Sequence, residues 1–474
     1  MTLPAKFVER VLRDLGGTEG AALCAALDAE PPVSVRLNPA KTGADTLPAG
    51  PDAGLPVPEA AGLPALAIAG RVPWSRDGRY LAVRPSFTLD PDFHAGAYYV
   101  QEASSQFVGH LLAAVRTEGA RILDLCAAPG GKTTLYASLA GPDGLVVANE
   151  IDRRRASVLA DNVRKWGTGN VAVTTCEPRA LGDFEAWFDV VAVDAPCSGE
   201  GMFRKDPDAR GEWSEGNVKQ CAARQDEILR EAWRALRPGG TLVYSTCTFN
   251  RDEDEGALER MAAWAGDEIA ESEETAVEDA WGIVCGRVGA FRTFRFYPHR
   301  ACGEGFFPPV ARKSSGAGGR VRAPKARRTV FAAVDRKTAG ELARWVRNPG
   351  GMHFAAVADT CYAWYAAQAD AVRTLSEALP VIYSGVALGQ VFKGVLKPDP
   401  ALAFFDGLNR GALPAAELDD EETLRFLRRQ DIAAGGLAEG MNLVCSRGRA
   451  LGFAKRIGAR VNNLYPSSLR IIKQ

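Results

Sequence analysis

The middle of the chain alternates between short runs of consecutive apolar residues and segments with apolar residues at helical spacing. The apolar runs predict five strands, at residues 121–125, 145–150, 171–175, 188–194 and 241–247. The segments between them predict helices at residues 101–118, 133–139, 153–166 and 220–236. Strands that are apolar along their whole length are covered on both faces. The alternation therefore predicts a doubly wound, Rossmann-like α/β fold with a parallel sheet.

The first 100 residues predict a small α+β lobe. Residues 1–32 favour helices, residues 31–39 a short strand closed by a turn, and the Pro-, Gly- and Ala-rich residues 40–72 a loose connection. Aromatic and basic side chains follow in residues 73–100: Trp74, Arg76, Arg79, Tyr80, Arg84, Phe87, Tyr98 and Tyr99. Such side chains can stack on bases and hold phosphates. Ordinary surface arginines on a small lobe would give the same pattern.

Basic residues gather in two places toward the other end. Residues 311–328 are rich in Gly, Ser and Ala and carry basic but no acidic side chains: Arg312, Lys313, Arg320, Arg322, Lys325, Arg327 and Arg328. From about residue 331 the pattern changes to short helices and strands, and the chain is basic again beyond Met441. A flexible basic segment attracts phosphates. We therefore expect RNA contacts here, with a merely solvated linker as the alternative.

Composition narrows the class of protein. The chain has 474 residues, 46% of them hydrophobic, which predicts a globular protein of two to four domains. The 57 basic and 58 acidic residues nearly cancel, so only local clusters can attract a polyanion. No apolar run approaches a membrane span, and the N-terminal segment has no secretion signal, so we expect a cytoplasmic protein. The ten cysteines form no C-x-x-C pair and the four histidines no metal spacing, so we expect no metal.

A small-residue loop, Cys126 to Gly131, joins the first predicted strand to the next helix. A P-loop would need glycine at position 126, where the chain has cysteine, and the dinucleotide pattern G-x-G-x-x-G is missing too. The loop is therefore suited to a small nucleoside. Glu150, at the end of the second strand, is placed to accept hydrogen bonds from a ribose diol, unless it only serves the following helix N-terminus. S-adenosylmethionine fits this arrangement better than NAD, because no pyrophosphate loop is present.

Two cysteines lie at the ends of predicted strands. Cys197 follows Asp194 in Asp194-Ala-Pro-Cys197, and Cys247 ends the strand that follows the next helix. Neighbouring parallel strands lie about 5 Å apart, so the two thiols share one cleft if these strands are adjacent. A lone cysteine at either place would more often belong to the core. Two thiols at strand ends beside an aspartate favour chemistry.

Thiol nucleophiles solve one methylation problem. Carbon C5 of cytosine is too weak a nucleophile to take a sulfonium methyl group directly. A thiolate that adds to C6 makes C5 reactive, and a carboxyl group can stabilise the adduct at N3. A base then removes the C5 proton and the thiol is eliminated, which combines covalent with acid–base catalysis.

Six stretches of the chain resemble the Nop2/Sun-type RNA cytosine-5 methyltransferases. They are 124–133 (DLCAAPGGKT), 194–201 (DAPCSGEG), 244–248 (YSTCT), 99–105 (YVQEASS), 298–299 (PH) and 305–307 (GFF). The resemblance covers residues 90–310. It implies S-adenosylmethionine as the cofactor, Cys247 as the nucleophile, Cys197 as the cysteine that releases the product, and Asp194 as the contact to the target base.

The same resemblance implies a set of cofactor-binding residues: Cys126, Ala127, Ala128, Pro129, Gly130, Gly131, Lys132, Glu150, Arg155, Glu177 and Asp194. One of them departs from the family pattern. The family carries an aspartate after the third strand, near the adenine, where this chain has Glu177. A glutamate can still accept a hydrogen bond from the adenine amino group.

The layout most resembles the bacterial RsmF type within this family. That implies an RNA-binding N-terminal lobe (1–100), a methyltransferase domain (101–310), a basic linker (311–330) and an RNA-binding region (331–474) that is PUA-like in its later part. Residues 388–394 resemble the start of a PUA-like domain. We expect a monomer that acts on small-subunit (16S) ribosomal RNA or its precursor. Transfer RNA, large-subunit ribosomal RNA, a DNA cytosine-5 methyltransferase and a non-catalytic ribosome-assembly factor are the alternatives.

Overall fold

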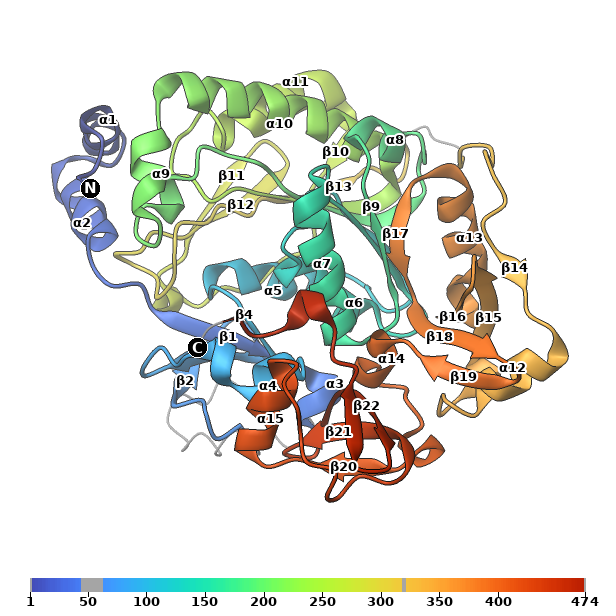
Figure 1. Ribbon diagram of the computed structural model, residues 1–474. Helices are drawn as coiled ribbons and strands as arrows, with labels where there is room; N and C mark the ends of the chain where they lie inside the picture. Colours follow the sequence, from blue (N-terminus) through green and yellow to red (C-terminus); the bar gives the residue numbers. More distant parts are fainter. Residues whose placement is uncertain (1, 44–62, 318–320, 473–474) are drawn as a thin grey trace.

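A large twisted sheet forms the centre of the protein, as a computed structural model that describes residues 2–43, 63–317 and 321–472 shows (Figure 1). In spatial order its strands are β11 (Val284–Val288), β12 (Phe291–Arg295), β13 (Val310–Lys313), β9 (Leu236–Ser245), β8 (Phe188–Asp194), β5 (Arg121–Asp124), β6 (Leu145–Asn149), β7 (Val171–Thr174) and β17 (Val381–Ser384). The five strands from β9 to β7 run parallel. They are the five strands that the apolar runs predict, so the predicted fold class is confirmed.

Helices cover both faces of this sheet, because alternate residues of each strand point to opposite sides. Ile122 and Val146 pack with residues of α5 (Phe107–Ala113), α6 (Gly131–Ala140) and α7 (Arg153–Trp166). Leu123 and Val147 pack instead with residues of α8 (Pro178–Gly182), α10 (Glu215–Ala235) and α11 (Glu255–Ala265). The fully apolar strands thus supply two cores, one on each side.

Both edges of the sheet extend beyond the predicted catalytic segment. Strand β13 pairs antiparallel with β9, so residues 311–313, which we placed in the linker, lie in the sheet. Lys313 is buried there, and its Nζ donates to the carbonyl oxygens of Trp233 and Leu236. At the opposite edge β17, from the C-terminal region, pairs antiparallel with β7. The predicted domain division therefore cuts through a continuous sheet, and its boundaries remain a prediction.

The N-terminal lobe has an α+β structure, as predicted. It comprises α1 (Ala5–Leu15), α2 (Gly17–Leu27), α3 (Pro39–Thr42), α4 (Pro91–His94), and a sheet of β2 (Ile68–Arg71), β3 (Gly78–Leu81), β1 (Val33–Leu37) and β4 (Tyr98–Val100). Several side chains that we expected to stack on bases are buried: Trp74, Arg79, Phe87 and Tyr98. Trp74, for example, packs edge-on against Phe296 with ring centroids 5.3 Å apart. These four side chains are not available to stack on bases, since Phe87 and Tyr98 belong to the core of the lobe, Trp74 packs into the central core, and Arg79 is buried. Part of the predicted connection 40–72, residues 44–62, lies outside the described residues.

Two further sheets make up the C-terminal region. The first contains β14 (Ala332–Ala333), β15 (Met352–Val357), β16 (Thr360–Tyr365), β18 (Val386–Phe392) and β19 (Val395–Pro398), with α12 (Arg336–Ala343), α13 (Ala369–Ala378) and α14 (Pro400–Phe404). The second contains β20 (Ala415–Glu417), β21 (Gly440–Ser446), β22 (Arg449–Ile457) and β23 (Arg460–Asn463), with α15 (Asp420–Leu427). The short helix α9 (Pro207–Glu212) and strand β10 (Ile269–Ala270) belong to the central part. Within the described ranges no helix is long and apolar enough to cross a membrane.

Candidate active site

The loop after β5 passes close to the helix behind it. At Gly130 φ is +109°, a left-handed conformation that favours glycine, and a Cβ there would lie 3.0 Å from Cδ1 of Leu159. The Ala128–Pro129 peptide bond is cis. Helix α6 begins at the next residue, Gly131, so its N-terminal amide groups face the loop. The backbone from Cys126 to Lys132 is thus arranged to approach a ligand closely.

Three residues hold this loop from behind, and two of them, Asn162 and Arg36, were not selected from the sequence. Tyr99 Oη donates to the carbonyl oxygen of Pro129 (3.2 Å), and Asn162 Nδ2 donates to the same oxygen (2.9 Å). The buried Arg36, on β1, donates through Nη2 to the carbonyl oxygen of Gly131 (3.1 Å). For Arg36 the sequence does contain a clue to such a supporting role, because a cation inside a short apolar strand needs a partner in the fold. Part of the N-terminal lobe therefore supports the cofactor loop.

Glu150 follows β6 and is only 3% exposed. Its Oε1 accepts a hydrogen bond from the backbone N of Asp152 (3.0 Å), and its Oε2 lies 3.2 Å from Nη1 of Arg155. Arg155 also donates through Nη2 to the carbonyl oxygen of Ala128 (3.0 Å). Glu150, Arg155 and the small-residue loop are therefore one connected unit, and their roles toward a cofactor stay a prediction.

The buried Asp124 at the end of β5 bears on whether these residues fit S-adenosylmethionine, because one of its oxygens has no partner among the described residues. Oδ2 of Asp124 accepts a hydrogen bond from Thr133 Oγ1 (2.6 Å), whereas Oδ1 has no hydrogen-bond partner among the described residues. Burial raises the pKa of Asp124 to about 7. A buried acceptor of this kind needs a donor, and the amino group of the cofactor is a suitable one. With the glycine loop and the Glu150 carboxylate, the residues fit that cofactor.

Glu177 lies apart from this unit. It precedes α8 as its N-cap residue, its side chain is exposed, and that side chain makes no capping hydrogen bond. Its place after β7 agrees with the motif, but among the described residues no hydrogen bond or ion pair joins it to Glu150 or Arg155. Its part in adenine binding stays a prediction.

Asp194 ends β8 and is held by two neighbours. Its Oδ1 accepts a hydrogen bond from Ser245 Oγ (2.7 Å), and its Oδ2 lies 2.8 Å from Nζ of Lys132. Burial lowers the pKa of Lys132, but the charges of Asp194 and Asp124 outweigh burial, so the pKa is raised. Lys132 is therefore a fixed positive charge between the cofactor loop and Asp194.

The two predicted cysteines meet beside Asp194. Strands β8 and β9 are adjacent and parallel, with Asp194 opposite Ser245, and the Sγ atoms of Cys197 and Cys247 lie 3.2 Å apart. The backbone N of Cys247 also donates to Sγ of Cys197 (3.4 Å). The hydrogen bond to Cys247, together with burial, raises the pKa of the Cys197 thiol well above its usual value. Cys197 is thus kept protonated.

A buried polar network, not found from the sequence, fixes the loop after Cys197. Glu253 Oε2 accepts hydrogen bonds from the backbone N of Ser198 (2.9 Å) and from Gln225 Nε2 (2.8 Å). Gln225 Nε2 also donates to the carbonyl oxygen of Pro196 (3.0 Å), and Asn250 Nδ2 donates to Glu253 Oε1 (2.7 Å). The loop that carries Cys197 is therefore tied to the segment after Cys247. Glu253 and Gln225 carry no motif of their own, so only the folded chain reveals them.

Family models match three parts of the chain. Residues 3–103 match the N-terminal domain of 16S rRNA methyltransferase RsmF, residues 111–311 match 16S rRNA methyltransferase RsmB/F, and residues 414–471 match the methyltransferase RsmF PUA domain. The family resemblance inferred from the motifs is thereby confirmed. The RNA-binding lobe and linker boundaries that we predicted are not defined by these matches.

Whole-chain relatives agree with the family models. The ribosomal RNA small subunit methyltransferase F of Shewanella loihica is 32% identical over 418 residues, which cover 84% of this chain and 83% of the relative. The protein of the same name from Escherichia coli O127:H6 is 32% identical over 425 residues, with 84% of each chain covered.

Solved structures show the same core. A methyltransferase homologue from Pyrococcus horikoshii, 26% identical, superposes with a TM-score of 0.51 over 66% of this chain and 100% of that one. NSun6 from the same organism, solved with the S-adenosylmethionine analogue SFG, is 20% identical, has a TM-score of 0.52 and covers 65% of this chain and 98% of its own. This second likeness shows the fold alone. The chain belongs to the ribosomal RNA small subunit methyltransferase F family of S-adenosylmethionine-dependent methyltransferases.

Proposed function

We propose that the protein methylates carbon C5 of cytidine in RNA through a covalent bond between Cys247 and C6 of the base. The proposal rests mainly on one observation. Two thiols lie 3.2 Å apart at adjacent strand ends, beside an aspartate that is paired with a lysine. Methyl transfer to an oxygen or an amine needs no thiol, whereas C5 methylation of cytosine needs a nucleophile at C6.

The cofactor-binding part of the proposal rests on the loop after β5. When bound, S-adenosylmethionine supplies a methyl group on a sulfonium. The backbone of 126–132 and the buried carboxylates of Glu150 and Asp124 would hold it. Arg155 keeps Glu150 close to the loop. Glu177 is proposed as an additional contact to the adenine.

The two thiols have different proposed roles. Cys247 gives its proton to solvent and its thiolate sulfur bonds to C6. After methyl transfer, a base takes the proton from C5, and the electron pair of that C–H bond expels the Cys247 thiolate. Cys197 stays a neutral thiol, since its pKa is raised, and a protonated thiol is a poor nucleophile. Its Sγ lies 3.2 Å from the Cys247 sulfur, so Cys197 can donate its proton to the departing Cys247 thiolate and then regain a proton from solvent.

Asp194 and Lys132 act on the base. Once N3 is protonated in the adduct, the Asp194 carboxylate at the end of β8 can accept hydrogen bonds from N3–H and from the exocyclic amine, which stabilises the adduct. Lys132 holds one carboxylate oxygen and Ser245 the other, so the carboxylate is already oriented before the base arrives. This preorganisation is what electrostatic catalysis requires.

Small-subunit ribosomal RNA is the proposed substrate. The relatives are named for that RNA, and one of the three matched family models is a PUA domain. Bisulfite sequencing of 16S ribosomal RNA from cells with and without the gene is the test. Loss of one or more 5-methylcytidines from 16S RNA, with return on complementation, is expected. Unchanged 16S RNA with a lost mark in transfer RNA or in large-subunit RNA would contradict the substrate.

A non-catalytic assembly factor is the second candidate, because the basic C-terminal region would serve it equally well. It would not need two thiols at the strand ends. Calorimetry with S-adenosylmethionine separates the two, since an assembly factor without cofactor binding would show no heat of binding.

A further inference from the structure

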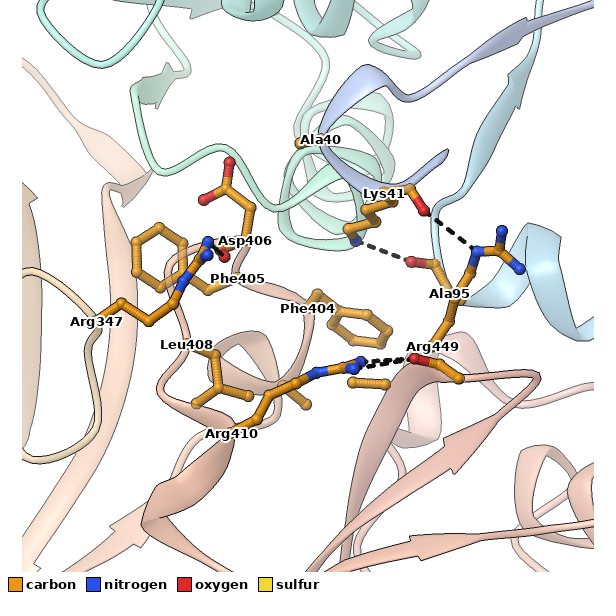
Figure 2. Close-up of a pocket in the computed structure, with 13 residues that line it drawn as sticks. Ala40, Lys41, Ala95, Arg347, Phe404, Phe405, Asp406, Leu408, Arg410 and Arg449 are labelled. Carbon is orange, nitrogen blue, oxygen red and sulfur yellow. Dashed lines mark hydrogen bonds between the residues drawn. The ribbon is translucent and has the colours of Figure 1, made fainter. Parts of the chain in front are cut away.

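A cavity of about 360 Å³ lies far from the strand ends, where three parts of the chain meet (Figure 2). Its wall comes from α3 and Ala95 in the N-terminal lobe, from Arg347 and the end of α14 with the residues after it, and from the start of β22 with the turn before it. The volume is at the lower end of the range of small-molecule sites. None of the predicted catalytic or cofactor-binding residues lines it. We call it the junction cavity.

The junction cavity is lined by more positive than negative side chains. Figure 2 shows four cationic side chains around it, and Asp406 is the acid on its wall. The cations are Lys41, Arg347, Arg410 and Arg449. Arg449 is matched by an acid outside the wall, since its Nη1 lies 2.8 Å from Oδ1 of Asp92. The carboxylate of Asp406 is therefore the one acid on the wall for the remaining cations, Lys41, Arg347 and Arg410.

Backbone oxygens, rather than carboxylates, orient the two exposed arginines. Arg410 donates through Nη1 and Nη2 to the carbonyl oxygen of Gly448, both at 3.0 Å, and Arg347 donates to the backbone oxygen of Asp406. Neither guanidinium forms an ion pair in the part of the chain that the structure describes. A carbonyl oxygen fixes a guanidinium without cancelling its charge. Both groups therefore keep donors and charge for an anion.

Lys41 supplies the third charge. Its Nζ donates to the carbonyl oxygens of Ala95 (2.8 Å) and Lys165 (2.7 Å). Burial lowers the pKa of Lys41 to about 7, and nearby cations add to this effect, while Asp406 opposes it. Those cations are Lys165, Arg410 and Arg449. An anion in the cavity would relieve this repulsion.

We propose that the junction cavity binds a phosphodiester group of the RNA substrate, with Arg347 and Arg410 as its ligands. Planar guanidinium groups match the phosphate oxygens, and the apolar side chains of Phe404 and Leu408 on the same wall suit the attached sugar. The inference rests on the proposed function only in that the substrate is RNA.

The place of the cavity predicts that it acts on binding and not on chemistry. Glu150 lies just before the N-terminus of α7, whereas Lys41 contacts the C-terminal end of that helix. A helix of 14 residues is about 21 Å long, so the phosphate site and the cofactor site are separated by about that distance. A phosphate held by Arg347 and Arg410 in the C-terminal region would lie in the same cavity as Lys41 of the N-terminal lobe, so one anion would link both parts.

The test is RNA binding by the full-length protein carrying Arg347→Gln and Arg410→Gln together. A filter-binding titration with a 16S ribosomal RNA transcript, repeated over a range of salt concentrations, gives the affinity and its salt slope. We expect about tenfold weaker binding and a salt slope reduced by about 1, with KM raised and kcat unchanged. Arg116→Gln with Arg224→Gln removes the same charge from two exposed arginines elsewhere. This control should leave the RNA affinity and its salt slope unchanged.

Inorganic phosphate distinguishes the two sources of the anion. Thermal unfolding is followed in wild type and in the double variant as phosphate is added, which also shows whether the variant is folded. Because both side chains are exposed, the single substitutions serve if the double variant is unstable. Normal RNA affinity in a variant that has lost stabilisation by phosphate would mean a free-phosphate site and overturn the RNA assignment. Normal RNA affinity with unchanged phosphate stabilisation would overturn the site altogether. If wild type itself neither binds nor methylates the transcript, the proposed function fails instead.

Discussion

The strand-end site and the junction cavity both collect charged side chains, but they arrange them in opposite ways. At the strand ends the two cations are paired with carboxylates: Lys132 lies 2.8 Å from Asp194, and Arg155 lies 3.2 Å from Glu150. In the junction cavity, the hydrogen bonds of Arg347 and Arg410 within the described part of the chain go to backbone oxygens. Paired charges fix positions for a reaction, whereas an excess of one charge attracts a polyanion. The two regions should therefore respond to different perturbations.

The largest effect is expected for Cys247→Ala. Removal of the nucleophile should lower methyl transfer to 16S RNA at least about a thousandfold, while RNA and cofactor affinity stay unchanged. Tritium transfer from labelled cofactor measures the rate. Cys285→Ala, at an exposed cysteine, is the matched control. Normal turnover in Cys247→Ala would contradict Cys247 as the nucleophile and the catalytic role of the strand-end site.

Asp194→Asn is expected to lower kcat about a hundredfold, because it removes the carboxyl group from the base and the partner from Lys132. Lys132→Met should have a similar effect. The double variant should lose less than the sum of the two in free energy, since the residues act as a pair. Asp183→Asn, at a surface ion pair with Arg234, serves as the control. Full additivity would contradict a coupled pair.

Glu150→Gln tests the cofactor end of the same site. Calorimetry should show about thirtyfold weaker S-adenosylmethionine binding, because the buried carboxylate loses its charge while its shape is kept. The exposed Glu227 on α10 offers a neutral control, Glu227→Gln. RNA affinity should not change. Weaker S-adenosylmethionine binding in the Arg347→Gln, Arg410→Gln variant would contradict separate roles for the two regions.

The smallest effect concerns pH and the junction cavity. The pKa of Lys41 is lowered to about 7, so its amine takes up a proton and becomes positively charged as the pH falls through 7. Wild type should therefore bind 16S RNA about threefold more tightly at pH 6 than at pH 8, and Lys41→Met should lose that difference. The groups that face Lys41 are Asp406, Lys165, Arg410 and Arg449, so the difference between wild type and Lys41→Met isolates this residue. Equal pH dependence in the two proteins would contradict a charged Lys41 in the cavity.

The sequence predicted the strand-end site in detail because short motifs sit where parallel strands end. Cys197 and Cys247 are 50 positions apart, and only the adjacency of β8 and β9 brings their sulfurs together. That adjacency was a condition of the prediction and is confirmed. The supporting residues were not predictable. Arg36 and Glu253 act through contacts with backbone atoms distant in the chain, which no local pattern records.

The junction cavity could not be read from the sequence at all. Lys41 and Arg449 are 408 positions apart, yet Arg449 Nε donates to the Lys41 carbonyl oxygen (3.4 Å). The aromatic residues of the N-terminal lobe misled us for a related reason. Composition shows that Trp74 and Tyr98 are present, but Trp74 is buried against the central core and Tyr98 in the lobe, so neither can stack on RNA.

Trapping the covalent intermediate tests the central claim most directly. RNA that carries 5-fluorocytidine at the target position cannot lose its C5 substituent, so the enzyme–RNA bond persists and the linked peptide can be sequenced by mass spectrometry. The account predicts a nucleotide attached to Cys247 in wild type, the same attachment in Cys197→Ala, and none in Cys247→Ala. Attachment to Cys197, or an adduct that survives in Cys247→Ala, would contradict it.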